Sequence, residues 1–291
     1  KIVINGQKTF ITGAAEYPYM LVLARDPKCE DPKLAFSLFW VDAKAPGVKI
    51  NPLHKIGWHL VSTCEVYLDN VVVEEKDMVG EEGKGFLNVM YNFEMERLIN
   101  ASRCTGFAEC AFEDAARYAN QRIAFGKPIG FNQMIQEKLA LMKVKCMNMR
   151  HLVLSCAVQA DRKESMRETA ALAKLYCART ALEVIDDAIQ IMGGLGYTND
   201  ARVSRLWRDV RCERIGGGEA EQQECVWKDS LHRFESFSVR SASGPGSRVP
   251  AARRGRTLRG LPLFCAFRFR VGLRLSVVLR IRVVNVFPVI D

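Results

Sequence analysis

The chain lacks the features that mark several large classes of protein. No apolar run reaches the roughly 18 to 20 residues that span a bilayer, so a membrane protein is not expected. A G-x-G-x-x-G motif is absent, which disfavours a Rossmann-type nicotinamide enzyme. There is no signal peptide and no initial Met, and Lys1-Ile2-Val3-Ile4 already has the pattern of a strand. We therefore expect the sequence to start inside a domain.

Paired cysteines are also missing. The ten cysteines are scattered along the chain, none forms a C-x-x-C pair, and no cluster of the four histidines accompanies them. This pattern disfavours a disulfide framework and a zinc site, so we predict no metal. Reduced, mostly buried thiols in a cytoplasmic protein are the simpler expectation.

The net charge of +9 is confined to the end of the chain. Residues 229–291 hold twelve Arg, no Lys and three acidic residues. Subtracting them from the 42 basic and 33 acidic residues of the whole chain leaves 30 of each in residues 1–228. The body of the protein is thus neutral, and the charge gives no indication that it binds nucleic acid.

Residues 1–79 are predicted to form a β domain. Tyr19–Ala24 and Leu34–Val41 are runs of strand-forming residues, and Cys64–Val73 alternates before it becomes β-branched. Pro-containing turns separate these runs, among them Asn51-Pro52. Crossover helices are missing, so an antiparallel sheet is the expected arrangement.

Residues 80–222 are predicted to form an all-α domain. Apolar and small residues recur there at spacings of three and four, with Arg97 on the same stripe: Phe86, Met90, Phe93, Ala101, Cys104, Ala108, Ala111 and Ala115. A second helix fits about 132–162 and a third about 166–192. The apolar face of the third is expected to contain Leu175, Ala178, Leu182, Ile185, Ile189 and Met192. The pair Gly193-Gly194 should end it. Long helices with short connections predict an antiparallel, four-helix-bundle-like domain, and the fold class is α+β.

Four motifs appear in one order along the chain. They are Asn5–Thr12 (NGQKTFIT), Arg122–Ile129 (RIAFGKPI), Gln190–Tyr197 (QIMGGLGY) and Arg208–Ile215 (RDVRCERI). Together they resemble the acyl-CoA dehydrogenase family, over residues 1 to about 218. Cys110–Arg122 is most similar to the carnitine-pathway branch, the crotonobetainyl-CoA reductases. The family's N-terminal helical domain has no counterpart in this sequence.

The resemblance implies a flavin enzyme that interconverts acyl-CoA and 2,3-enoyl-CoA thioesters. Thr12 is expected at flavin N5 and Phe10 against the isoalloxazine ring, as a flat apolar partner should be. Arg122 would meet the FAD pyrophosphate with its guanidinium fork, and Phe125 would pack near the adenosine.

The resemblance also implies an oligomer. Gln190, Gly193 and Gly194 would contact the FAD of a neighbouring subunit, which implies a homodimer or homotetramer. Without the family, a helix C-cap is the simpler interpretation of the two glycines. An electron-transfer flavoprotein is the expected redox partner.

Two positions can carry the catalytic base in the family. A carboxylate of raised pKa in a dry pocket suits the removal of a Cα proton. Many members carry it in a loop after the R-I pair, but Gly217 occupies that position here. Others carry a Glu just before an Arg on the first long helix, as Glu96-Arg97 does here. We predict that Glu96 is the base and that Arg97 contacts CoA, the alternative being that Glu96 is an ordinary solvated helix carboxylate.

Residues 223–291 resemble no part of this family and are predicted to be disordered. Ser241–Gly260 is rich in Arg, Gly, Ser and Pro, and Phe267–Val283 alternates Arg with apolar residues. One alternative function is therefore an inactive fragment, or a nucleic-acid- or membrane-binding module that acts through this basic tail. A salt-dependent DNA affinity that is lost with residues 240–291 would favour the binding module, and a yellow chromophore would favour the enzyme.

The tail yields the first testable prediction. Twelve Arg without a Lys are typical of a GC-rich gene read in the wrong frame, so residues from about 219 onward are expected to be a frame-shifted readout. Translating the other frames downstream of the Gly216–Gly218 codons should give a hydroxyl residue, an acidic residue and an amphipathic helix. Mass spectrometry that finds the C-terminal peptides of this tail in the natural protein would overturn the expectation.

Overall fold

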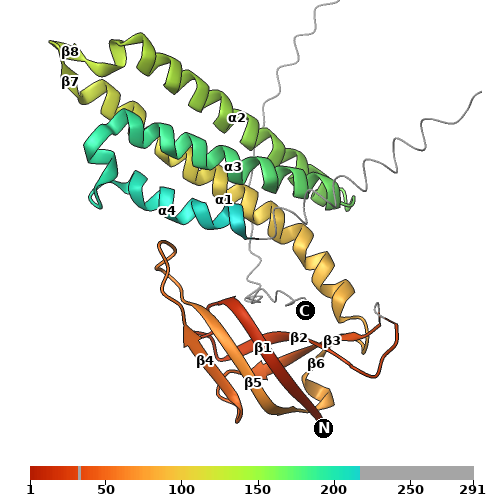
Figure 1. The fold of residues 1–291 in the computed structure, drawn as a ribbon. Helices are drawn as coiled ribbons and strands as arrows, with labels where there is room; N and C mark the ends of the chain where they lie inside the picture. Colours follow the sequence, from red (N-terminus) through yellow and green to blue (C-terminus); the bar gives the residue numbers. More distant parts are fainter. Residues whose placement is uncertain (32–33, 217–291) are drawn as a thin grey trace, which may run out of the picture.

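The computed structural model describes residues 1–31 and 34–216, which form a β domain followed by a bundle of helices (Figure 1). The predicted tail at residues 223–291 lies outside the described residues, as does the predicted end of the helical domain between 217 and 222. No helix in the described part of the chain is long and apolar enough to cross a membrane.

The β domain consists of two small sheets. The first has the strand order β1 (Ile2–Thr12), β5 (Thr63–Val73) and β4 (Val48–Pro52). The second has the order β2 (Tyr19–Arg25), β3 (Phe36–Asp42) and β6 (Met78–Val79), preceded by the short helix η1 (Glu75–Asp77). All pairings between these strands are antiparallel, which confirms the expectation from the sequence.

Alternate side chains along the strands point inward and fill the space between the two sheets. Ile4, Ile11 and Val66 point inward from the first sheet, and Val22 and Val41 point inward from the second. Asn51-Pro52 is not the turn that the sequence predicts, because β4 continues through Pro52. β4 is an edge strand, where a proline without an N–H is tolerated.

The helical domain begins with α1 (Gly85–Gln121), a single helix of 37 residues. A hairpin of β7 (Ile123–Ala124) and β8 (Lys127–Pro128) and the short helix η2 (Ile129–Phe131) connect it to α2 (Gln133–Asp161). Then follow α3 (Arg167–Met192), η3 (Gly193–Tyr197) and α4 (Arg202–Ile215). Successive helices run in opposite directions (Figure 1). The second and third helices lie within a residue of their predicted bounds, whereas the sequence analysis did not assign α4.

Small side chains form the contact between α1 and α3, which we call the small-residue seam. It is made of fully buried residues: Ala101, Cys104, Ala108, Ala111, Ala115 and Ala119 of α1, and Ala170, Ala173, Cys177, Ala181, Val184 and Ala188 of α3. Helices that meet through such residues can pack at short interaxial distance. Met142 and Met149 of α2 fill the space beside the seam.

The predicted core of the helices is correct only in part. The α1 stripe is buried from Ala101 to Ala115, but Phe86 at its start lies beside Phe36 of β3 and is 39% exposed. On α3, the predicted Leu175 and Leu182 are only partly buried, and the smaller Cys177 and Ala181 take the core positions. Gly193 caps α3 with a φ of 59°, as predicted for a glycine at a helix end.

Two methionines of α2 give a matched test of this packing. Met142 is fully buried and Met147 is 48% exposed on the same helix. We expect Met142→Ala to lower the free energy of unfolding of the helical domain by about 2 to 5 kcal/mol, because it leaves a cavity. Met147→Ala should cost about 0.5 kcal/mol or less. Denaturant unfolding followed by circular dichroism would measure both, and equal losses would contradict the assignment of the core.

Candidate functional site

The end of β1 leaves two of the predicted flavin residues exposed. Ile11 points into the core and is 3% exposed, whereas Phe10 is 65% exposed and Thr12 is exposed as well. The pairing of β1 with β5 shifts register between Lys8 and Ile11, and Phe10 adopts a φ of 63°. A positive φ is unfavourable for a residue with a side chain, so this backbone must be held by its surroundings.

The turn after β1 is held by residues that the sequence analysis missed. The Glu16 carboxylate accepts hydrogen bonds from the backbone N–H of Ser62 at 2.9 Å and from its hydroxyl at 2.6 Å. The Gly13 N–H donates to the Ser62 carbonyl at 2.9 Å. The hydroxyl bond lowers the pKa of Glu16, helped by the backbone bond, although burial acts in the opposite direction. The sequence contains no motif that announces this contact, since Glu16 and Ser62 are 46 residues apart.

The two acids near the start of α1 have different environments. The Glu94 carboxylate accepts a hydrogen bond from the Met166 N–H at 3.3 Å, at the start of α3. Glu96 lies about 200° further around the helix, at 100° per residue. It shares a stripe with Asn100 and Arg103, because residues at i, i+4 and i+7 lie on one helical face. Glu96 is partly buried, as is Arg97 beside it.

Contacts of Arg103 show where this stripe faces. Nη2 of Arg103 donates to Oε2 of Glu213 on α4 at 2.8 Å and forms an ion pair with its Oε1 at 2.8 Å. It also lies over the ring of Trp58 from the β domain, 4.6 Å from the ring centroid. The stripe that carries Glu96 therefore faces the junction between the β domain and α4.

The end of α4 comes to the same junction. Arg202 at its start pairs with Asp114, and Glu213 near its end pairs with Arg103, so α4 runs antiparallel to α1. The buried Lys174 of α3 donates a hydrogen bond to the carbonyl of Gly216, the last described residue. From Glu213 to Gly216, α4 thus leads toward the level of Glu96 on α1.

The remaining predicted cofactor residues lie at the other end of the bundle. Arg122 is the C-cap of α1, and Phe125 is fully exposed at the tip of the β7–β8 hairpin with a φ of 53°. Gln190 and Gly193 lie where α3 ends, which is the same end of the bundle (Figure 1). The ion pair of Lys138 with Asp187, at 2.7 Å, links the beginning of α2 to this part of α3.

Within one chain, Glu96 lies far from the predicted cofactor residues at the end of the bundle. Glu96 and Arg122 are separated by 26 positions of one helix, which is about 39 Å at 1.5 Å per residue. A β-carbon added to Gly126, Gly193 or Gly194 would meet nothing within 4 Å. The bundle end therefore presents an exposed Arg, an exposed aromatic ring and open backbone, all of which fit a ligand held from outside the chain.

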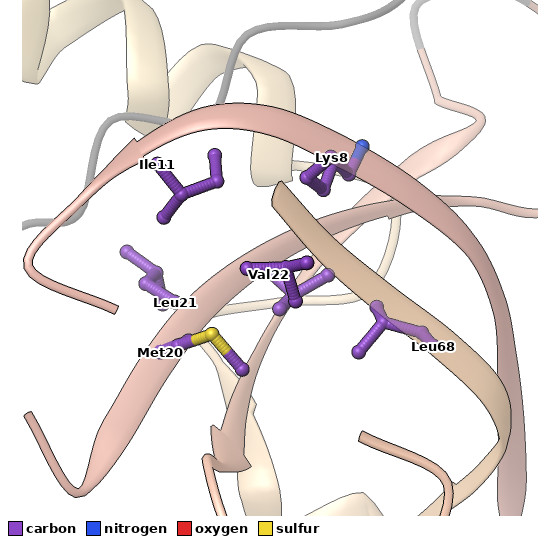
Figure 2. Close-up of a pocket in the computed structure, with 7 residues that line it drawn as sticks. Lys8, Ile11, Met20, Leu21, Val22 and Leu68 are labelled. Carbon is purple, nitrogen blue, oxygen red and sulfur yellow. The ribbon is translucent and has the colours of Figure 1, made fainter. Parts of the chain in front are cut away.

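Among the described residues, we find no second candidate for a catalytic or metal site in the interior. Figure 2 shows a small recess between the sheets that Ile11, Met20, Val22 and Leu68 line, with Lys8 at its edge. Burial lowers the pKa of Lys8, but no acid lies among the lining residues. Burial also raises the pKa of the Cys146 thiol to about 11 and that of Cys177 to about 12, which makes both poor nucleophiles. Across residues 1–31 and 34–216, no cluster of His, Cys, Asp and Glu could hold a metal ion.

Comparison with known families matches both domains. Residues 1–71 match "Acyl-CoA dehydrogenase, middle domain", and residues 83–230 match "Acyl-CoA dehydrogenase, C-terminal domain". The second match runs eight residues past the domain end predicted at 222, which stays a prediction. A curated relative, "Probable acyl-CoA dehydrogenase YdiO" of Escherichia coli K12, is 81% identical over 221 residues. These residues are 76% of this chain and 58% of that protein, so the chain spans less than two thirds of its relative.

Solved structures agree with this match. Butyryl-CoA dehydrogenase from Megasphaera elsdenii is 32% identical with a TM-score of 0.75, over 79% of this chain and 60% of that one. An acyl-CoA dehydrogenase from Geobacillus kaustophilus is 29% identical with a TM-score of 0.76, over 78% and 61%. A glutaryl-CoA dehydrogenase in complex with glutaryl-CoA is 29% identical with a TM-score of 0.75, over 79% and 59%.

Proposed function

This chain belongs to the acyl-CoA dehydrogenase family, and on that premise we propose that the protein interconverts acyl-CoA and 2,3-enoyl-CoA thioesters with FAD. The observation that carries the proposal is the position of Glu96. It lies on the face of α1 from which Arg103 contacts the β domain and α4. In the sequence, Gly217 occupies the position where many family members have a carboxylate.

Residues of the β domain fit a flavin ring. FAD, when bound, accepts the hydride that leaves the substrate Cβ. Phe10 offers an exposed aromatic face, and Thr12, two residues further on the same strand, offers a hydroxyl that can donate to a ring nitrogen. Thr12 pairs with Thr63, the first residue of β5, which follows the segment that contacts α4. The flavin residues and Glu96 thus border the same junction.

Glu96 takes the Cα proton in this proposal, or returns it when the enzyme reduces. Glu94 is the less suitable acid, because it lies on another face of α1, where its carboxylate accepts a hydrogen bond from the Met166 N–H at the start of α3. The end of α4 that leads to Gly217 lies beside the same face of α1, which supports the choice of Glu96. A base on a rigid helix is also better positioned than one on a loop.

The bundle end fits the other half of the cofactor. Arg122 and Phe125 supply a guanidinium fork and an aromatic face, and Gln190, Gly193 and Gly194 supply an amide and open backbone. Because about 39 Å of helix separates Arg122 from Glu96, one FAD molecule does not reach both groups of a single chain. We infer that these residues hold the FAD of a neighbouring subunit in a homodimer or homotetramer.

Finer features of the proposal come from the family. Arg97 is proposed to contact CoA, whose phosphates suit a guanidinium group. The electron acceptor is proposed to be an electron-transfer flavoprotein and the location cytoplasmic. Within the family, the proposed branch is that of the carnitine-pathway crotonobetainyl-CoA reductases. The alternative of a nucleic-acid- or membrane-binding tail concerns residues outside the described part of the chain.

Replacing Glu96 tests the proposed base. In the full-length protein, we expect Glu96→Gln to lower turnover by far more than tenfold while flavin stays bound, because the amide cannot accept the Cα proton. Steady-state kinetics with the flavin spectrum recorded would measure this. The matched control is Glu94→Gln, whose amide oxygen can still accept the Met166 N–H. Turnover of Glu96→Gln within about tenfold of the parent, a barrier change of about 1.4 kcal/mol, would exclude Glu96 as the base.

Replacing Arg122 tests the shared cofactor. Arg122→Ala should release FAD and weaken the oligomer together, since one side chain serves both. Gel filtration with absorbance at the flavin band would follow both properties. Arg150→Ala is the control, because Arg150 pairs with Glu109 on the side of the bundle, far from its end. A monomer that keeps one FAD per chain would refute the sharing.

A further inference from the structure

Trp58, Arg103 and Glu213 form a contact between the two domains that we call the interdomain clamp. Each residue comes from a different part of the chain: the segment before β5, the middle of α1 and the end of α4. Glu213 is almost wholly buried, with 6% of its side chain exposed, and Arg103 is 34% exposed. A carboxylate buried to this extent is tolerated when a charged, hydrogen-bonding partner is present, and Arg103 supplies that partner.

The segment before β5 is shaped to present Trp58. Trp58 has a φ of 55°, and the Lys55 ammonium binds the carbonyls of Trp58 at 2.8 Å and Val61 at 2.5 Å. Gly57 is required for the approach to α4, because a β-carbon there would lie 2.7 Å from the Arg208 carbonyl oxygen. A strained backbone held by specific contacts is a feature of built sites.

Trp58 also binds α4 directly. Its backbone N–H donates to the Asp209 carboxylate at 2.6 Å, and its indole N–H donates to the Asp209 carbonyl at 2.8 Å. The face of the same ring carries the Arg103 guanidinium. The Trp58 side chain of the β domain thus contacts both α1 and α4, and Glu213 of α4 pairs directly with Arg103 of α1.

The interdomain clamp connects three elements whose relative positions matter for the proposed reaction: the start of α1 with Glu96, the end of α4, and β1 with Thr12. Arg103 is two helical turns from Glu96 on one stripe of α1, and it also donates a hydrogen bond to Asn100 between them. Glu213 is one turn before Gly216, whose carbonyl is bound by Lys174. Trp58 is in the segment that leads to Thr63, the pairing partner of Thr12. Movement of the clamp would therefore change the relation of Glu96, the end of α4 and the flavin face of β1.

We propose that Arg103 is a positioning residue of the proposed reaction, which holds the end of α4 and the β domain in register with Glu96 through Glu213 and Trp58. The proposal rests on the proposed function of this site. Arg103 itself contacts neither proton nor flavin in it. Its effect is geometric, and displacements of about 1 Å at a reacting centre can lower rates by about a hundredfold.

The test uses Arg103→Met in the full-length flavoprotein, with Arg150→Met as the matched control. Both changes remove an arginine that binds a glutamate, but Arg150 and Glu109 lie away from the junction. We expect Arg103→Met to lower kcat at least about tenfold with KM changed less than about threefold and flavin content unchanged. Hydrogen exchange of residues 209–216 should rise, while that of 133–161 should not. Arg150→Met should change neither kcat nor exchange at 209–216.

Conservative variants keep the proposal falsifiable if Arg103→Met does not fold. Arg103→Lys should restore part of kcat, because it keeps a charge for Glu213 but loses the planar stack on Trp58. Trp58→Phe keeps an aromatic face for Arg103 but removes the five-membered ring with its N–H donor to Asp209, so it should raise exchange at 209–216 less than Arg103→Met does. A kcat of Arg103→Met within twofold of the parent, or a loss of kcat that comes with flavin loss and faster exchange throughout the bundle, would overturn the proposal.

The outcomes separate this proposal from the proposed base. If Glu96→Gln retains turnover while Arg103→Met still loosens residues 209–216 and lowers kcat, the base is elsewhere and the clamp stands. If Glu96→Gln abolishes turnover and Arg103→Met changes nothing, the base stands and the clamp is wrong.

Discussion

A single uninterrupted helix sets the distances on which the rest of this protein depends. α1 is 37 residues long, about 55 Å at 1.5 Å per residue, and it contacts the β domain at one end and the β7–β8 hairpin at the other. No proline interrupts it, and the helix continues through Gly106. Because the helix is stiff, Glu96 and Arg122 keep a fixed separation, and a second subunit is the simplest way to bring both kinds of residue to one cofactor.

Strained backbone occurs where the proposed chemistry is. Five non-glycine residues in the described part of the chain have a positive φ, and three of them are the aromatic residues Phe10, Trp58 and Phe125. Each such residue costs on the order of 1 to 3 kcal/mol, which the surrounding fold must offset. Phe10 is exposed where the flavin ring is proposed to bind and Phe125 where the adenosine of FAD is proposed to bind, and the ring of Trp58 contacts Arg103. At all three aromatic residues, an unfavourable backbone conformation thus places a ring where a contact is proposed or observed.

Sequence patterns predicted the domain order, the antiparallel strands and the boundaries of α2 and α3, because hydrophobic periodicity and turn residues are local properties. On α3 they correctly placed Ala178 and Ile185 in the core. They also placed Leu175 and Leu182 there, because large apolar residues are the expected core, but both are only partly buried, and the smaller Cys177 and Ala181 are fully buried. The motifs located residues of the candidate site but not its supports. The contacts of Glu16 with Ser62 and of Trp58 with Asp209 join residues far apart in the chain, and no spacing rule predicts such pairs.

The small-residue seam has a consequence for how this family member can vary. Alanine and cysteine fill the contact between α1 and α3 completely, so even one added methyl group must push two long helices apart. Enlarging Ala108 or Ala181 would strain both long helices at once, because no space remains beside these fully buried residues. The seam is therefore expected to be the part of the described helices that tolerates the fewest enlargements.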